Sequence, residues 1–207
     1  MFNGVIAVII AYLLGSIPSA YIVTRLKTGK DIRQLGGGNV GARNVFHEVG
    51  LWAAIIVSVF DIGKGAAAVA IASWLLGAPL FFVLAAGLAA VAGHMWSIYL
   101  KFTGGNGLAT SIGVLSLLMT RELLIIIAII IVFIVITRNT VLSVNISFLS
   151  LPVSAWFLEK SWPFVIFSVV LLLILVLNFL PTARAAFVKA GSRENFFAEL
   201  LRRKKAE

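Results

Sequence analysis

Long apolar runs alternate with short polar segments along almost the whole chain. A helix needs about 20 consecutive apolar residues to cross the hydrocarbon core of a bilayer, and most of the runs reach or approach this length. We therefore predict an all-α integral membrane protein with about seven transmembrane helices, in one membrane domain over residues 1–190 that a basic tail follows at 191–207. The predicted spans cover residues 4–24, 51–77, 80–100, 107–120, 122–137, 141–158 and 163–180.

Composition supports this class and orients the predicted helices. Of the 207 residues, 61% are hydrophobic and 12% are charged, against about 25% charged in ordinary soluble domains. With an outside N-terminus, every lysine and arginine except Lys64, Arg121 and Lys160 falls on one side, which the positive-inside rule makes cytoplasmic, together with the C-terminus. The net charge of +9 favours membrane lipids and anionic metabolites as partners. We do not expect nucleic acid as a partner, because the sequence contains no soluble domain that could bind it.

The beginning of the chain and its lack of cysteine exclude several alternatives. "MFNGVIAVII" has no basic n-region, and Ser16 and Pro18 lie deep in the first run, so we interpret this run as a retained helix and not as a cleaved signal peptide. Without cysteine the chain has no disulfide, no thiolate metal site and no thioester-forming nucleophile. Neither histidine has neighbours that suggest a metal site, and we expect no cofactor.

Asp61, Lys64 and His94 are ionisable residues that fall within the predicted spans. Asp61 and Lys64 are three residues apart in "VFDIGKGAAAV", which places them on one face of a helix. Such residues usually pair or line a polar cavity, so the two either neutralise each other and join helices, or Lys64 holds an anion that Asp61 helps to position. His94 is either a hydrogen-bonded interfacial residue or a general base near the cytoplasmic end of the third span.

Two glycine-rich cassettes, "LGGGNVGARN" at 35–44 and "FTGGNGLATS" at 102–111, interrupt the apolar pattern. Successive glycine N–H groups can face one anion, and a helix N-terminus that follows adds a positive dipole. Neither cassette is a Walker motif or a dinucleotide fingerprint. Because both lie on the predicted cytoplasmic side with several basic residues, they predict a site for phosphate or acyl-phosphate. These basic residues are Arg33, Arg43, Lys64 and Lys101.

Three ordered motifs carry a family resemblance. They are "GSIPSAYIVTRLKTGKDIRQLGGGNVGARN" at 15–44, "DIGKG" at 61–65 and "GHMWSIYLKFTGGNGLAT" at 93–110. In order and spacing they resemble the acyl-phosphate-dependent glycerol-3-phosphate acyltransferases, small integral membrane enzymes of bacteria. The resemblance covers the first 110 residues well and the remainder loosely.

The resemblance implies transfer of a fatty acyl group from acyl-phosphate to the 1-hydroxyl of glycerol 3-phosphate. The products would be lysophosphatidic acid and phosphate, in phospholipid biosynthesis at the cytoplasmic face of the bacterial cell membrane. A soluble acyl-phosphate synthase would be the partner that supplies the donor. The donor is already activated, so the enzyme would need to position two anions and supply a base, either His94 or a phosphate oxygen of a substrate.

Site residues follow from the motifs. The catalytic candidates are Ser16, Asp61, Lys64 and His94. The candidates for binding substrate and phosphate are Arg33, Gly36, Gly37, Gly38, Asn39, Gly41, Arg43, Asn44, His47, Lys101, Gly104, Gly105, Asn106, Gly107 and Thr110.

The chain also departs from the family pattern. Thr103 and Asn106 replace two lysines, Ser97 replaces a proline, and "GSREN" at 191–195 represents a longer C-terminal motif. We hypothesise that the missing positive charge has moved to Arg43 and Lys101. Two alternatives stay open: a divergent paralogue with another polyol-phosphate acceptor, and a non-enzymatic anion transporter or lipid-binding protein. The clustering of polar residues on one side favours the enzyme over a transporter.

Overall fold

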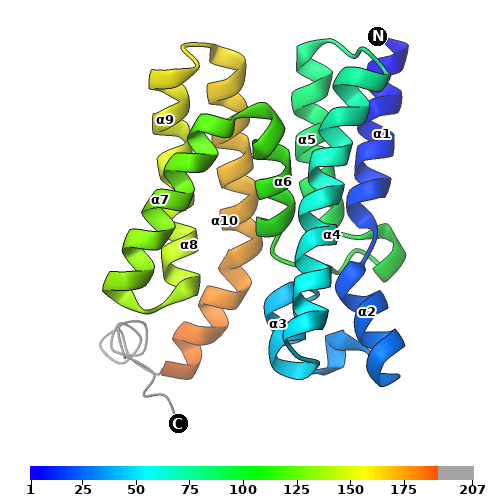
Figure 1. Ribbon diagram of the computed structural model, residues 1–207, viewed down its shortest axis with the longest axis vertical. Helices are drawn as coiled ribbons and strands as arrows, with labels where there is room; N and C mark the ends of the chain where they lie inside the picture. Colours follow the sequence, from blue (N-terminus) through cyan, green and yellow to red (C-terminus); the bar gives the residue numbers. More distant parts are fainter. Residues whose placement is uncertain (191–207) are drawn as a thin grey trace. The chain divides into compact units, whose positions relative to one another are not determined.

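The structure, a computed structural model, describes residues 1–190, and in that range it is built from helices without a strand (Figure 1). The predicted all-α class is confirmed. The chain divides into two compact units, the first from Met1 to Leu118 and the second from Met119 onward. The predicted basic tail at 191–207 and its "GSREN" motif lie outside the described residues.

Apolar helices occur at all seven predicted places, but they differ in length. Within the described part, five helical segments are long and apolar enough to cross a membrane. The other two, Leu80–Met95 and Leu108–Leu118, are shorter than the predicted spans 80–100 and 107–120, because the second glycine-rich cassette and the turn before it interrupt the helical pattern. The five segments are Phe2–Thr28, Leu51–Leu75, Thr120–Thr137, Thr140–Leu158 and Trp162–Pro181. Seven spans and an outside N-terminus therefore stay predictions.

The first unit is a bundle of long helices with short helices and loops at one end. Its long helices pack in pairs, α1 against α5 and α4 against α6 (Figure 1). The elements in chain order are α1 (Phe2–Ser16), α2 (Ser19–Thr28), η1 (Ile32–Gln34), α3 (Ala42–Glu48), α4 (Leu51–Ala70), the π-helical turn η2 (Ile71–Leu75), α5 (Leu80–Met95), η3 (Ile98–Leu100) and α6 (Leu108–Leu118).

A proline breaks the first apolar run into α1 and α2. Pro18 has no N–H, and its ring clashes with the carbonyl one turn earlier, so the helix stops at Ser16 and restarts at Ser19. The carbonyl of Ile17 leaves the helical ladder at this break and accepts a hydrogen bond from the Lys64 ammonium at 2.9 Å. Irregular backbone inside a membrane protein needs such a partner. The break therefore places a polar backbone group and a cation next to each other in the bundle.

Glycines allow the helix pairs to approach closely. A Cβ added at Gly15 of α1 would collide with the backbone of Ala90 in α5, and one at Gly93 would collide with the carbonyl of Tyr12. In the second pair, Gly65 of α4 faces the carbonyl of Thr110, whereas Gly63 faces open space. Small residues at helix interfaces serve this purpose in membranes, where packing replaces much of the hydrophobic driving force. The site residues on α1, α4 and α5 are thereby brought within reach of each other.

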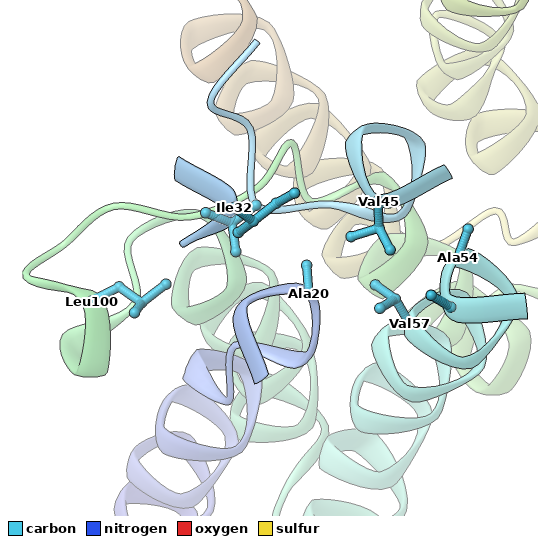
Figure 2. Packing of buried hydrophobic residues seen from close by; sticks show 8 residues of the cluster. Ala20, Ile32, Val45, Ala54, Val57 and Leu100 are labelled. Atoms are coloured by element: carbon cyan, nitrogen blue, oxygen red, sulfur yellow. The ribbon is translucent and has the colours of Figure 1, made fainter. Parts of the chain in front are cut away.

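A small apolar core holds the first glycine-rich cassette against the end of the bundle. Ile32 from η1 and Val45 from α3 are fully buried, and they belong to one cluster with Val57 of α4 and Leu100 of η3. Figure 2 shows these side chains together with Ala20 and Ala54. This core fixes the loop between α2 and α3 although the loop itself has little regular structure.

The second unit contains α7 (Thr120–Thr137), α8 (Thr140–Phe148), α9 (Ser150–Leu158) and α10 (Trp162–Ala190). Helix α7 packs against α8 and α9, and α9 packs against α10. Buried hydroxyls return hydrogen bonds to carbonyls of their own helix, such as Ser147 to Ser143 at 2.6 Å. Arg121 at the start of α7 donates to Glu159 after α9 at 3.1 Å, which joins the ends of these helices.

Candidate active site

Asp61 is the centre of the candidate site. Its side chain is 2% exposed, and its Oδ1 atom accepts a hydrogen bond from the Ser19 hydroxyl at 2.7 Å. The same oxygen lies 2.7 Å from Nζ of Lys64 and 3.5 Å from Nδ1 of His94. One buried carboxylate thus joins side chains of α2, α4 and α5.

Lys64 balances the charge of this carboxylate. Its ammonium contacts Asp61 and the Ile17 carbonyl, so the buried cation has an anionic partner and a backbone acceptor. An unpaired ion would be costly here, because charge in a low-dielectric interior requires compensation. The predicted pairing of Asp61 with Lys64 is present, and it links α4 to the break between α1 and α2. The pair can therefore stabilise the bundle and also supply a fixed positive charge at the site.

His94 is buried, and its two ring nitrogens face different groups. Nδ1 lies toward Asp61, and a Cβ added at Gly105 would collide with Nε2. A carboxylate beside Nδ1 favours the tautomer with the proton on Nδ1, which leaves the lone pair of Nε2 available as a base. Gly105 is needed at its position because a larger residue would displace the imidazole. Asp61 thus orients the imidazole of His94, and the predicted role of His94 as a base stays a prediction.

A small cavity lies among these groups. Its volume is about 10 Å³, which leaves room for about one water molecule. All four catalytic candidates line it, together with Gly104 of the binding candidates. The lining residues are Ser16, Ile17, Pro18, Ser19, Val40, Asp61, Lys64, His94, Ser97, Leu100 and Gly104. The Ser16 hydroxyl is buried and has no hydrogen-bond partner in the described part of the chain, so it can interact with a group that enters the cavity.

The second cassette forms one wall of this cavity. Gly104 packs against the carbonyls of His94 and Met95, so closely that a Cβ would collide with both. The amide of Gly105 donates to the His94 carbonyl at 3.1 Å. Gly107 has a positive φ of 79° and precedes α6, as the prediction of a helix after the cassette requires. Thr110 lies within α6, fully buried, and Asn106 is partly buried.

The first cassette lies beside the second. The amide of Val40 donates to the carbonyl of Gly104 at 3.4 Å, which connects the two cassettes directly. Gly36 and Gly38 have positive φ values of 52° and 71°, a conformation that favours glycine. A Cβ at Gly37 would meet nothing within 4 Å, so this position has space for a side chain. The two predicted cassettes therefore come together at one end of the first unit.

Asn44 holds the first cassette in shape. Its buried side-chain amide lies within hydrogen-bond distance of the carbonyls of Ile32, Leu35 and Asn39, at 3.3, 3.0 and 3.0 Å. Asn39 itself is half-buried, and a Cβ at the buried Gly41 would approach its side-chain amide to 3.0 Å. These contacts place Asn44 in the frame of the cassette, whereas its predicted contact with phosphate stays a prediction.

The remaining basic candidates lie outside the cavity. Arg33 is bound to Asp31 at 2.6 Å and lies over the ring of Tyr21. Its guanidinium hydrogen bond holds the pKa of Asp31 below the ordinary value, so this pair stays charged at neutral pH. Exposed positions are occupied by Arg43 and His47, both on α3, and by Lys101, whose φ is 56°. None of the four lines the cavity.

Sequence reasoning missed two serines of the site. Ser19 donates to Asp61, and Ser97 donates to the Ser16 carbonyl at 2.6 Å. Ser97 stands where the family pattern has a proline. The signal for Ser19 was present, because it follows the helix-breaking Pro18, but its partner is 42 residues away in the chain.

Fold and site define a class: a polytopic membrane protein with a buried Asp-Lys-His cluster beside two glycine-rich loops. The family model described as glycerol-3-phosphate acyltransferase matches residues 5–186. The chain is 43% identical over 188 residues to glycerol-3-phosphate acyltransferase 2 of Dehalococcoides mccartyi, which covers 91% of this chain and 89% of the relative. It is 38% identical to glycerol-3-phosphate acyltransferase 2 of Moorella thermoacetica, over 80% and 84% of the two chains. The chain therefore belongs to the glycerol-3-phosphate acyltransferase family, and the predicted resemblance is confirmed.

Solved structures agree with this assignment. The crystal structure of PlsY (YgiH), an integral membrane glycerol 3-phosphate acyltransferase, in its glycerol 3-phosphate form matches with a TM-score of 0.82 and 27% identity, over 91% of this chain and 92% of that chain. The lysophosphatidic acid form matches with a TM-score of 0.77 and 26% identity, over 95% and 91% of the chains. The protein is thus an integral membrane protein of an acyltransferase family that acts in phospholipid biosynthesis.

Proposed function

We propose that the protein transfers a fatty acyl group from acyl-phosphate to the 1-hydroxyl of glycerol 3-phosphate at the cytoplasmic face of the membrane. The products are lysophosphatidic acid and inorganic phosphate. Family membership supports the acceptor, and the two neighbouring glycine-rich cassettes support a site for two phosphate groups. The observation that carries the proposal is the buried contact of His94 with Asp61 beside Lys64, in a cavity that both cassettes border.

The reaction requires one proton transfer and one exchange of bonds at the acyl carbon. Nε2 of His94 accepts the proton of the 1-hydroxyl of glycerol 3-phosphate, while the oxygen of this hydroxyl attacks the carbonyl carbon of acyl-phosphate. The new C–O ester bond forms, the C–O bond to phosphate breaks, and the phosphate leaves with the electron pair. The imidazolium is stabilised by Asp61 and returns its proton to the departing phosphate. No covalent enzyme intermediate is needed, because the donor is already activated.

The other site groups supply charge and orientation. Lys64 provides a fixed positive charge near the anions, and its salt bridge to Asp61 holds it in position. The unpartnered hydroxyl of Ser16 can donate to an oxygen of a substrate. Arg43 and Lys101 are exposed near the two cassettes and can attract the anionic substrates, as the hypothesis of relocated charge requires.

Substrate binding requires the site to widen. A cavity of about 10 Å³ holds one water molecule, whereas both substrates are many times larger. The wall formed by Val40, Leu100 and Gly104 contains the long 3.4 Å hydrogen bond between the cassettes. We place the opening at this contact, because it joins two loops and not two packed helices.

The test is an assay of purified protein with palmitoyl-phosphate and glycerol 3-phosphate, in which lysophosphatidic acid and released phosphate are both measured. Equimolar product and phosphate are expected, with palmitoyl-coenzyme A inactive as donor. Activity only with another polyol phosphate would identify a different acceptor, and no product from folded protein in any arm would contradict the proposal. Uptake of glycerol 3-phosphate by vesicles without donor tests for a transporter.

His94 variants test the assigned base. His94→Ala should lower kcat by about 10²- to 10⁴-fold, and His94→Gln, which keeps a polar group of similar size, should not restore it. A His47→Ala variant changes the other histidine, a candidate for substrate binding that lies exposed on α3 away from the cavity, so any effect should fall on KM and not on kcat. If His94→Ala retains kcat and its pH profile, a substrate phosphate is the base. We also expect a soluble acyl-phosphate synthase to sustain the reaction when palmitoyl-phosphate is omitted.

A further inference from the structure

The turn between α9 and α10 contains a second cavity, in the second unit and unrelated to the acyl-transfer site. Its volume is about 270 Å³, close to the lower end of small-ligand pockets. The lining residues are Trp156, Phe157, Lys160, Ser161 and Trp162. Three aromatic side chains, one cation and one hydroxyl therefore border a space large enough for a small polar group.

A ring contact and backbone hydrogen bonds define the turn that borders this space. The rings of Trp156 and Trp162 meet edge to face, with centroids 5.0 Å apart and planes at 69°. Lys160 has a positive φ of 48°, which is uncommon for a residue with a side chain. The carbonyl of Ser161 accepts hydrogen bonds from the amides of Phe164 and Val165, both at 3.2 Å, and this fixes the start of α10. The two tryptophans therefore form an aromatic wall of the cavity.

The polar groups of the cavity have unused bonding capacity. Glu159, next in sequence to Lys160, is paired with Arg121 at 3.1 Å. Lys160 itself is exposed and takes part in none of the ion pairs among residues 1–190. The Ser161 hydroxyl likewise has no hydrogen bond within that range. A cation and a hydroxyl donor side by side suit the oxygens of a phosphate group.

The surroundings of the cavity suit a lipid more than a soluble anion. An exposed apolar stripe runs down α10 from Trp162 through Ile166 and Val169, which are 65%, 59% and 39% exposed. On α9, Phe157 and Val153 are 67% and 59% exposed one helical turn apart. These faces lead away from the cavity along the helices, where acyl chains would lie. Tryptophan and lysine are also the residues that mark the interface of a bilayer.

We propose that this cavity binds the phosphate head group of an anionic glycerophospholipid. Lys160 and Ser161 hold the phosphate oxygens, Trp156 and Trp162 cover the glycerol part, and the acyl chains follow the apolar faces of α9 and α10. This differs from an ordinary aromatic belt, which anchors a helix without selecting a head group. The proposal is independent of the acyl-transfer reaction and of its substrates.

The test is a titration of the full-length protein in detergent with dihexanoyl phosphatidylglycerol, followed by native mass spectrometry. The expected result is one saturable adduct. Lys160→Gln should weaken its binding by at least about tenfold, because a charged hydrogen bond is lost. Lys27→Gln removes an exposed lysine of the first unit and should leave binding unchanged. Trp162→Ala should also weaken binding, whereas Trp162→Phe retains an aromatic wall and should keep most of it.

Several outcomes would overturn the proposal. These are the lack of a saturable adduct, equal binding by the Lys160→Gln protein, and equal binding of dihexanoyl phosphatidylcholine. Displacement of the lipid by millimolar inorganic phosphate would show that a soluble anion occupies the cavity. Acyl-transfer activity, measured in parallel, should be the same in every variant and confirms that each protein is folded.

Discussion

At the scale of single residues, one carboxylate oxygen organises the candidate site. Oδ1 of Asp61 contacts Ser19, Lys64 and His94, so a change at any of these groups alters the environment of the others. A single substitution at one of these groups therefore affects both the stability of the fold and the rate of catalysis. Paired substitutions can separate them, because the ion pair can be removed as a unit.

Asp61→Asn should lower both stability and activity. It leaves the Lys64 cation buried without an anion, and breaking a buried pair costs about 3–5 kcal/mol. The double variant Asp61→Asn/Lys64→Gln removes both charges, so it should recover most of the melting temperature and little of the kcat. Thermal unfolding in detergent and the acyl-transfer assay measure the two effects. Recovery of kcat in the double variant would show that the pair is structural alone.

Ser19→Ala tests a residue of the first motif that was not among the predicted site candidates. The substitution removes the 2.7 Å hydrogen bond to the Asp61 carboxylate, which orients His94. Loss of this donor should lower the free energy of unfolding by about 1–3 kcal/mol. We expect kcat to fall about tenfold or more, with little change in the KM for glycerol 3-phosphate. Ser58→Ala is the matched control on α4, since that hydroxyl bonds only to the Ala54 carbonyl of its own helix. Equal kcat values for the two variants would contradict a positioning role.

At the scale of elements, close approach of helices brings the site together. Gly65 of α4 packs against the backbone of Thr110 in α6, and Gly113 of α6 packs against the backbone of Ile62 in α4. The glycines thus contribute at two points of the same interface. Gly63, two residues before Gly65, faces open space, which provides a comparison within one helix.

Gly65→Ala and Gly63→Ala should have opposite effects on stability. The first inserts a methyl group against the Thr110 carbonyl, and overpacking of this kind costs about 1–3 kcal/mol. The second adds helix propensity without a clash and should stabilise by up to about 1 kcal/mol. Melting temperatures of the two purified variants measure the difference. A Gly65→Ala protein as stable as the Gly63→Ala protein would mean that α4 and α6 are not in close contact.

At the scale of the whole molecule, the distribution of basic residues predicts an orientation in the membrane. The glycine-rich cassettes should face the cytoplasm, and the turn between α9 and α10 should face outward. The chain has no cysteine, so a single introduced cysteine can report the side of its loop without background labelling.

Lys30→Cys and Lys160→Cys provide that report. Both positions are exposed, the first in the loop before η1 and the second in the turn before α10. A membrane-impermeant maleimide should label the Lys160→Cys protein in intact cells and the Lys30→Cys protein only after permeabilisation, as mass shifts of the purified proteins will show. The reverse pattern would place the active site outside. Labelling of both proteins in intact cells would contradict the predicted odd number of spans between the two positions.

The local pattern of residues was sufficient for much of the fold. Apolar runs located all seven helical segments, and the three-residue spacing placed Asp61 and Lys64 on one face. The break at Pro18 within the predicted span 4–24 appeared only in the structure. The pattern overestimated the lengths of the third and fourth spans. Periodicity alone does not show that the helix ends before Trp96 or that the second cassette is not helical. The motifs also selected the right family, since their order is a property of the chain itself.

The sequence by itself determined the helices, the membrane class and the family, because these depend on hydrophobicity, spacing and motif order along the chain. Only the tertiary structure decided which candidates share the site. It brought Ser19 to Asp61 across 42 residues and Ser97 to Ser16 across 81, and it assigned Asn44 to the frame of a loop. These contacts depend on where glycines let helices approach and where a proline frees a carbonyl, and such packing between distant segments leaves no periodic signal in a single sequence.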